Sequence, residues 1–160
     1  MSDIGLFILR AVAGGFILKY GLPKIRDVDG KFAKEFEGLG FNPVRTYVTR
    51  AGLAESIAGA LTVLGSLGPV GPMLLLSDMM VATVSTTARA KHFDPSDHED
   101  ELLYASIALL LALSGPGAIS LDSALGIRVF DRAWLRYLAV AGALAGAAFM
   151  LSQRTSSPDT

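Results

Sequence analysis

The chain has 160 residues, of which 51% are hydrophobic, a formal net charge of −1 and no cysteine. The near-neutral charge, with basic residues spread among the acids, gives no reason to expect a nucleic-acid partner. The lack of cysteine excludes disulfides, thiolate catalysis and cysteine-ligated metal centres within the chain. The apolar residues form long blocks between short charged segments. Because a chain of this length cannot hide several wholly apolar helices from water, the pattern predicts an all-α integral membrane bundle.

Five segments are predicted to cross the membrane, since each approaches the roughly 20 residues that an α-helix needs to span the hydrocarbon. They are residues 4–22, 43–67, 70–88, 96–114 and 134–151. Pro23 is expected to end the first helix, Asn42 to cap the second, and Ser96 with Glu99 to form a capping box at the fourth. No secretory signal peptide is recognised, so the first segment is expected to be retained as a span.

The longest polar connection runs from residue 24 to residue 50. Within it, Phe32, Phe36 and Leu39 repeat at helical spacing. This pattern fits either a short amphipathic helix on the lipid headgroups or a solvated loop. Near the other end of the chain, Gly142 and Gly146 form a small-residue face suited to close helix packing.

The distribution of basic residues predicts the orientation, because cytoplasmic loops retain Lys and Arg. One side of the predicted five-span topology carries most of them: Lys24, Arg26, Lys31, Lys34, Arg45, Arg50, Arg89, Lys91 and Arg154. The other side carries Arg128, Arg132 and Arg136. The N-terminus is therefore predicted outside and the C-terminus inside.

Ionisable side chains inside apolar spans are functional candidates, since each costs free energy in lipid unless it is paired or hydrated. Helical spacing places Arg10, Glu55 and Asp78 on faces that carry small or polar residues. We therefore expect them to form an interior polar cluster. Two interpretations stay open: an ion pair that fixes helix register, or a binding or proton-handling site. Lys19 lies near the end of its helix and is expected to reach the headgroups.

His92 and His98 are weak candidates for metal binding. Both lie in the connection around Asp94, away from the predicted spans, among Asp97, Glu99 and Asp100. Haem ligation needs histidines on facing helices, which this placement does not provide. We expect two solvated loop histidines and no metal centre.

An ordered series of short features resembles the DoxX family of small bacterial and archaeal membrane proteins. These are Arg10, the run Tyr20-Gly21-Leu22-Pro23-Lys24, Gly40-Phe41, Glu55 with Gly59, Leu64-Gly65, and GPGAISLD at 115–122, which includes Gly115, Pro116, Gly117 and Asp122. The resemblance implies a four-helix membrane bundle over residues 1–122. It leaves residues 123–151 as an extension with a fifth span and residues 152–160 as a disordered tail. Asp78 is not part of the resemblance.

The resemblance also implies a function, because a relative in this family is the small subunit of a thiosulfate:quinone oxidoreductase. No Gly-x-Gly-x-x-Gly fingerprint for a flavin or dinucleotide is present, so the chain is not expected to be catalytic alone. The leading hypothesis is an auxiliary or anchoring subunit of a quinone-linked redox or oxidative-stress complex in a prokaryotic plasma membrane, in contact with lipid and other membrane subunits. A small-solute transporter and a purely structural packing subunit are the alternatives. No cofactor is encoded by a motif, and quinone is the group that the resemblance suggests.

Overall fold

The computed structural model describes residues 2–154, and all regular structure in that part of the chain is helical. Five long helices are α1 (Asp3–Arg26), α3 (Val44–Leu64), α4 (Val70–Ala90), α5 (Glu99–Ser114) and α7 (Ala133–Ser152). Shorter elements are α2 (Lys31–Gly38), η1 (Pro95–His98), α6 (Leu121–Ala124) and η2 (Val129–Asp131). The predicted all-α fold with five long helices is confirmed. Residues 155–160, most of the predicted disordered tail, lie outside the described part.

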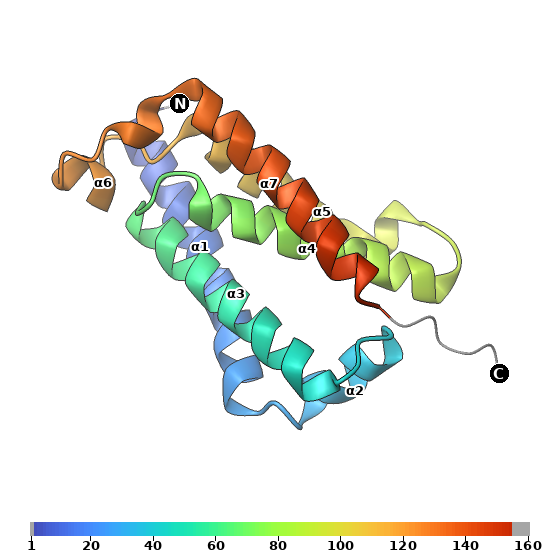
Figure 1. Cartoon of the computed structure of the whole chain (residues 1–160). Helices are drawn as coiled ribbons and strands as arrows, with labels where there is room; N and C mark the ends of the chain where they lie inside the picture. The colour runs from blue at the N-terminus through green and yellow to red at the C-terminus, as the bar shows by residue number, and fades with distance from the viewer. Residues whose placement is uncertain (1, 155–160) are drawn as a thin grey trace.

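The five long helices alternate in direction through one bundle (Figure 1). At one end, which we call the turn end, the Asp3 carboxylate accepts a hydrogen bond from the N–H of Ala118 at 3.3 Å. At the opposite end, which we call the α2 end, the Arg154 guanidinium donates to the carbonyl of Leu39 at 2.9 Å. Figure 1 shows that α3 and α4 diverge from the turn that joins them. The bundle is therefore tied together at both ends but widens at one of them.

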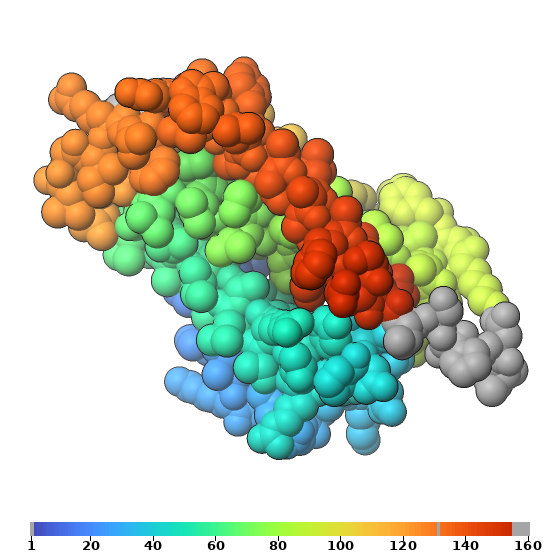
Figure 2. All heavy atoms as spheres, viewed as in Figure 1, coloured from blue at the N-terminus to red at the C-terminus, as the bar shows by residue number. Residues whose placement is uncertain are grey.

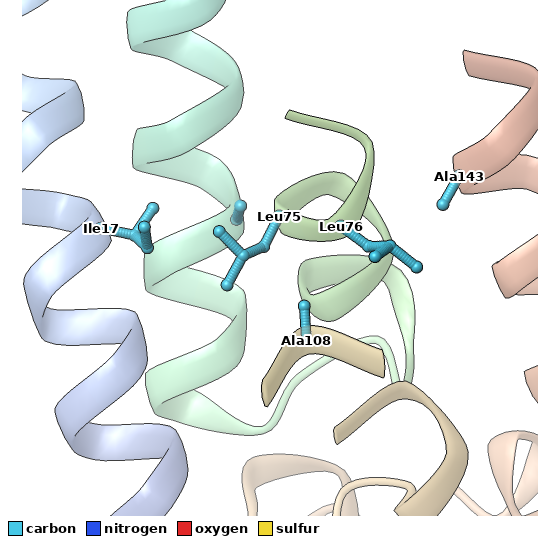
Figure 3. Packing of buried hydrophobic residues seen from close by; sticks show 6 residues of the cluster. Ile17, Leu75, Leu76, Ala108 and Ala143 are labelled. Atoms are coloured by element: carbon cyan, nitrogen blue, oxygen red, sulfur yellow. The ribbon is translucent and has the colours of Figure 1, made fainter. Parts of the chain in front are cut away.

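The centre of the bundle is a hydrophobic cluster to which each long helix contributes (Figure 3). Its buried members are Ile17, Ala58, Leu75, Leu76, Ala108 and Ala143. Small alanines on α3, α5 and α7 let these helices approach the larger side chains of α1 and α4. Because α7 joins this cluster, it is an integral part of the bundle.

Helices α1 and α3 pack against each other through glycines. A Cβ added at Gly14 would lie 2.7 Å from the carbonyl oxygen of Gly59, and a Cβ at Gly59 would lie 2.7 Å from that of Gly14. One or two helical turns away, a Cβ at Gly21 would lie 2.7 Å from the amide nitrogen of Ser56. Small residues let two backbones come this close, which is a common way for helices to associate in lipid.

The predicted small-residue face of α7 packs on α4. A Cβ at Gly142 would lie 3.3 Å from the sulfur of Met73, and a Cβ at Gly146 would lie 3.2 Å from the hydroxyl of Ser77. The face is therefore used inside the chain. Larger side chains of α7, including Tyr137, Leu138 and Phe149, remain exposed.

Three helices, α1, α4 and α7, are long and apolar enough to cross a membrane. Large apolar side chains are exposed along their outer faces, for example Ile8 at 54% and Leu138 at 57%. Lipid solvates such surfaces, whereas soluble monomers rarely expose large contiguous apolar patches. Helix α3 carries Arg45, Arg50 and Glu55, and α5 has 16 residues, so their crossing of the membrane stays a prediction.

Three predicted helix boundaries are wrong. Helix α1 continues through Pro23 to Arg26, since a proline removes one hydrogen bond but the following turn still forms, with the N–H of Asp27 bonded to the carbonyl of Pro23. Asn42 does not cap α3, whose N-cap is Pro43. The Ser96 capping box does not form either, because Asp94 accepts the N–H of Ser96 and starts η1 instead.

Candidate functional site

A cavity of about 620 Å³ opens inside the bundle towards the α2 end. Side chains from α1, α2, α3, α4, α5 and α7 line it. In the space-filling view, the surface is hollowed between α3 and the C-terminal half of α7 (Figure 2). Its volume lies in the range of about 300–1,000 Å³ that is usual for small-molecule sites. The widening of the bundle thus creates a space that a ligand can fill.

An ion pair forms the polar wall of this cavity. The Lys24 ammonium donates to Oε1 of Glu55, and the two side chains are only 13% and 5% exposed. Lys24 reaches Glu55 because α1 continues for a turn beyond the expected stop at Pro23. A buried carboxylate needs such a partner, because leaving it unpaired in a low-dielectric interior is strongly unfavourable.

Asp78 adds a second carboxyl to this wall from α4. It lines the cavity with Glu55 and Lys24 and lies within electrostatic reach of both. The structure therefore brings Glu55 and Asp78 together, as predicted from their helical faces. Two carboxyl groups share a single ammonium, which leaves the cluster rich in hydrogen-bond acceptors.

Aromatic residues of α2 and the following loop cover the cavity at the α2 end. The Lys24 ammonium lies 5.3 Å from the ring centroid of Phe32 and 5.9 Å from that of Phe36. Phe36 contacts Phe41, which contacts Tyr47 at the start of α3. This aromatic cluster holds α2 as a helix over the ion pair. The segment is therefore a helix and not a loop, while its place on the lipid headgroups stays a prediction.

One side of the cavity is apolar, whereas its rim is charged. Apolar side chains of α4 and α7, including Leu74, Met79 and Phe149, line one side. Acidic residues Glu35, Asp100 and Glu101 lie at the rim with the basic residues Lys31 and Arg50. The cavity thus offers an apolar surface next to a charged wall, an arrangement that fits an amphiphilic molecule.

Arg10 does not join Glu55 and Asp78, and the expected three-residue cluster is corrected on this point. Its buried guanidinium donates to the carbonyls of Pro116 and Ile119 at the turn end. Arg10 lies opposite Gly65, the C-cap of α3, whereas Gly21 lies opposite Glu55 within α3. At about 1.5 Å per residue, the ten helical positions between Glu55 and Gly65 separate the two sites by about 15 Å.

Asp122 is the charged partner of Arg10 at the turn end. Its carboxylate, fully buried, accepts the N–H groups of Leu67 at 3.0 Å and Gly68 at 2.6 Å and interacts electrostatically with Arg10. Gly65, Leu67 and Gly68 all have positive φ angles, between 55° and 61°. The Arg10–Asp122 pair therefore fixes the tight turn between α3 and α4.

The other family-motif positions divide between the two ends. Tyr20 and Lys24 line the cavity, while Gly21 and Gly59 form part of the α1–α3 contact. Gly115 and Gly117 follow α5 with φ angles of 79° and 73°, which only glycine adopts readily. The motif GPGAISLD is thus the turn-end loop that receives Arg10.

The two histidines differ from each other. His92 is exposed, as expected, and lies 3.9 Å from Asp97. His98 was expected to be solvated, which is wrong: it is 3% exposed, its ring nitrogens meet the hydroxyls of Thr86 and Thr87, and it stacks on Phe93. In the same connection, hydrogen bonds that Ser96 donates lower the pKa of the Asp94 carboxyl.

Within residues 2–154, no group of three or more His, Asp or Glu side chains is arranged to hold a metal ion.

The sequence marks Lys24 as a family-motif position but does not predict that it pairs with Glu55. The reason is that Pro23 is expected to end the helix, which would place Lys24 in a loop. The signal was its spacing: Lys24 follows Gly21 by three positions and Ile17 by seven, so it shares the buried face of α1. Lys19, by contrast, is exposed, as its predicted place near the headgroups requires.

Comparison with known proteins gave one family match. The family described as DoxX matches residues 5–88, which comprise nearly all of α1 to α4 together with Lys24, Glu55 and Asp78. The turn-end loop at 115–122, α5 and α7 lie beyond the matched region. Neither the curated proteins nor the solved structures gave a match to the chain.

Proposed function

Because the chain belongs to the DoxX family, whose model covers residues 5–88, we propose that this small membrane protein is an auxiliary subunit of a quinone-linked redox complex and that its cavity binds the quinone. The observation that carries the proposal is the cavity of about 620 Å³ with Lys24, Glu55 and Asp78 on its wall. A quinone has an apolar tail and a head group, the ring, which carries two polar carbonyl oxygens. It reaches the cavity through lipid, and its head then lies against the charged wall.

The lining supports this ligand class. Leu74, Met79 and Phe149 offer an apolar surface for the ring and tail. Lys24, Tyr20 and Tyr104 offer hydrogen-bond donors for the oxygens of the head. Because this chain has no cysteine and no dinucleotide fingerprint, the electrons would be exchanged with a partner subunit.

The test is purification in mild detergent followed by solvent extraction and chromatography of bound quinone, with identification of the chains that co-purify. We expect quinone and a redox subunit with the native protein. Lys24→Met should lower the quinone content at least tenfold, since the wall loses its ammonium. Lys19→Met, on the exposed side of the same helix, should keep it. Neither quinone nor a redox partner in the native preparation would refute the proposal.

A transporter for a small cationic or protonated solute is the second candidate. The observation that favours it is the excess of carboxyl groups over ammonium groups in the wall, since Glu55 and Asp78 share only Lys24. Solute or proton flux into liposomes that contain the pure protein, abolished by Asp78→Asn, would support the transporter. Absence of flux together with bound quinone would support the redox subunit.

A further inference from the structure

One oxygen of Glu55 is left without a donor. Oε1 accepts from Lys24, but Oε2 is buried and has no hydrogen-bond partner among residues 2–154. The side chain as a whole is only 5% exposed. Buried carboxylate oxygens are normally paired, because desolvation without a hydrogen bond costs free energy. An unpaired acceptor on the wall of a cavity points to a ligand that donates a hydrogen bond to it.

The groups that face Glu55 supply fewer donors than its wall has acceptor oxygens. Lys24 is engaged with Oε1 and covered by Phe32 and Phe36. Asp78 lies within side-chain hydrogen-bonding reach of Glu55, but the two carboxyl groups together present four acceptor oxygens to the Lys24 ammonium and at most one shared proton. The remaining charged and phenolic residues of the lining are Tyr20, Lys31, Glu35, Arg50, Asp100, Glu101 and Tyr104, and none is bonded to Oε2. Carboxyl groups outnumber basic groups over the lining as a whole.

We infer that the cavity selects a head group with hydroxyl donors, namely the reduced quinol in preference to the oxidised quinone. This inference rests on the proposed function and specifies the form of the ligand. A quinol hydroxyl donates to Oε2 of Glu55, and Asp78 is a second acceptor beside it. The carbonyl oxygens of a quinone only accept, so they can use Lys24, Tyr20 and Tyr104 as donors but gain nothing from Oε2 of Glu55 or from Asp78.

The experiment compares a decyl-substituted benzoquinol with the matching benzoquinone, both titrated anaerobically against the whole protein in nanodiscs of zwitterionic lipid. A second pair, a decylphenol and its methyl ether, differs only in the donor and undergoes no redox change. We expect the donor-bearing member of each pair to bind at least tenfold more tightly, which corresponds to about 1.4 kcal/mol.

Two variants test whether the preference for the donor-bearing ligand depends on Glu55. Glu55→Gln should reduce the preference to about onefold, because the amide replaces the unpaired acceptor. Glu37→Gln, an exposed acid on α2 outside the cavity lining, should keep the tenfold preference. Should Glu55→Gln fail to fold without the Lys24 pair, the phenol and ether titrations of the native protein decide the question alone.

The outcomes separate this inference from the proposed function. Equal or tighter binding of the quinone and of the ether would overturn the donor preference while leaving quinone binding intact. Binding of neither member of either pair would overturn both. A tenfold preference that persists in Glu55→Gln would also overturn the assignment to Glu55.

Discussion

Asp122 shows how one side chain can hold two distant loops. Its carboxylate binds the backbone of the α3–α4 turn and lies beside Arg10, which binds the loop after α5. The turn contains Leu67 at a φ of 58°, a conformation that costs a non-glycine residue about 1 kcal/mol or more. The hydrogen bonds that the Asp122 carboxylate accepts from Leu67 and Gly68 offset this cost and fix where α4 begins.

We therefore expect Asp122→Ala to destabilise the protein by about 3–5 kcal/mol, since removal of one partner leaves the Arg10 charge buried without a carboxylate to balance it. Thermal unfolding in detergent, followed by the loss of helical circular dichroism, measures this effect. Asp29→Ala, which removes an exposed carboxylate, should change the unfolding midpoint little. Equal midpoints for Asp122→Ala and the native protein would contradict the role of Asp122.

The candidate site shows what residue-level prediction can reach. Helical spacing placed Glu55 and Asp78 on inward faces, and the structure brings them together. The same reasoning placed Arg10 on an inward face correctly. It could not give the position of Arg10 along the bundle axis or its partner, because several buried groups can accept hydrogen bonds from a guanidinium. The pairing of Lys24 with Glu55 was not predicted, because a proline does not always end a helix.

At the scale of elements, the α1–α3 contact depends on glycines that allow the backbones to touch. We expect Gly59→Ala to destabilise the bundle by about 1–3 kcal/mol, because its Cβ would lie 2.7 Å from the Gly14 carbonyl and 2.8 Å from Leu18. Gly15→Ala is the matched control, since a Cβ there has nothing within 4 Å. Unfolding in increasing dodecyl sulfate measures both variants. A Gly59→Ala protein as stable as Gly15→Ala would show that this contact tolerates a wider spacing.

Helix α7 extends the cavity beyond the matched family region. Gly146, Phe149 and Met150 line the space, and Arg154 bonds to the loop after α2. The sequence predicted this helix as an addition to a four-helix bundle. Its position across the cavity depends on α4, because the glycines of α7 need a complementary surface of Met73 and Ser77.

At the scale of the molecule, the basic residues at the α2 end predict that this end faces the cytoplasm. The chain has no cysteine, so single cysteines can be introduced without background labelling. We expect Arg128→Cys to react with a membrane-impermeant maleimide in intact cells. Lys34→Cys on α2 should react only after the membrane is permeabilised. The reverse pattern would contradict the predicted orientation.

The sequence by itself determined the helical membrane fold, because blocks of apolar residues with few charges have one stable solution in lipid: backbone groups paired within helices. It also indicated which glycines and which carboxyl groups face inward, since a period of 3.6 residues fixes the face of each helix. Only the tertiary structure decided that Glu55 pairs with Lys24, that Arg10 pairs with Asp122, and that a cavity lies between α3 and α7. The depth of a buried side chain and the residue it pairs with depend on the axial position of each helix relative to its neighbours. That register is set by long-range packing, which no local sequence pattern encodes.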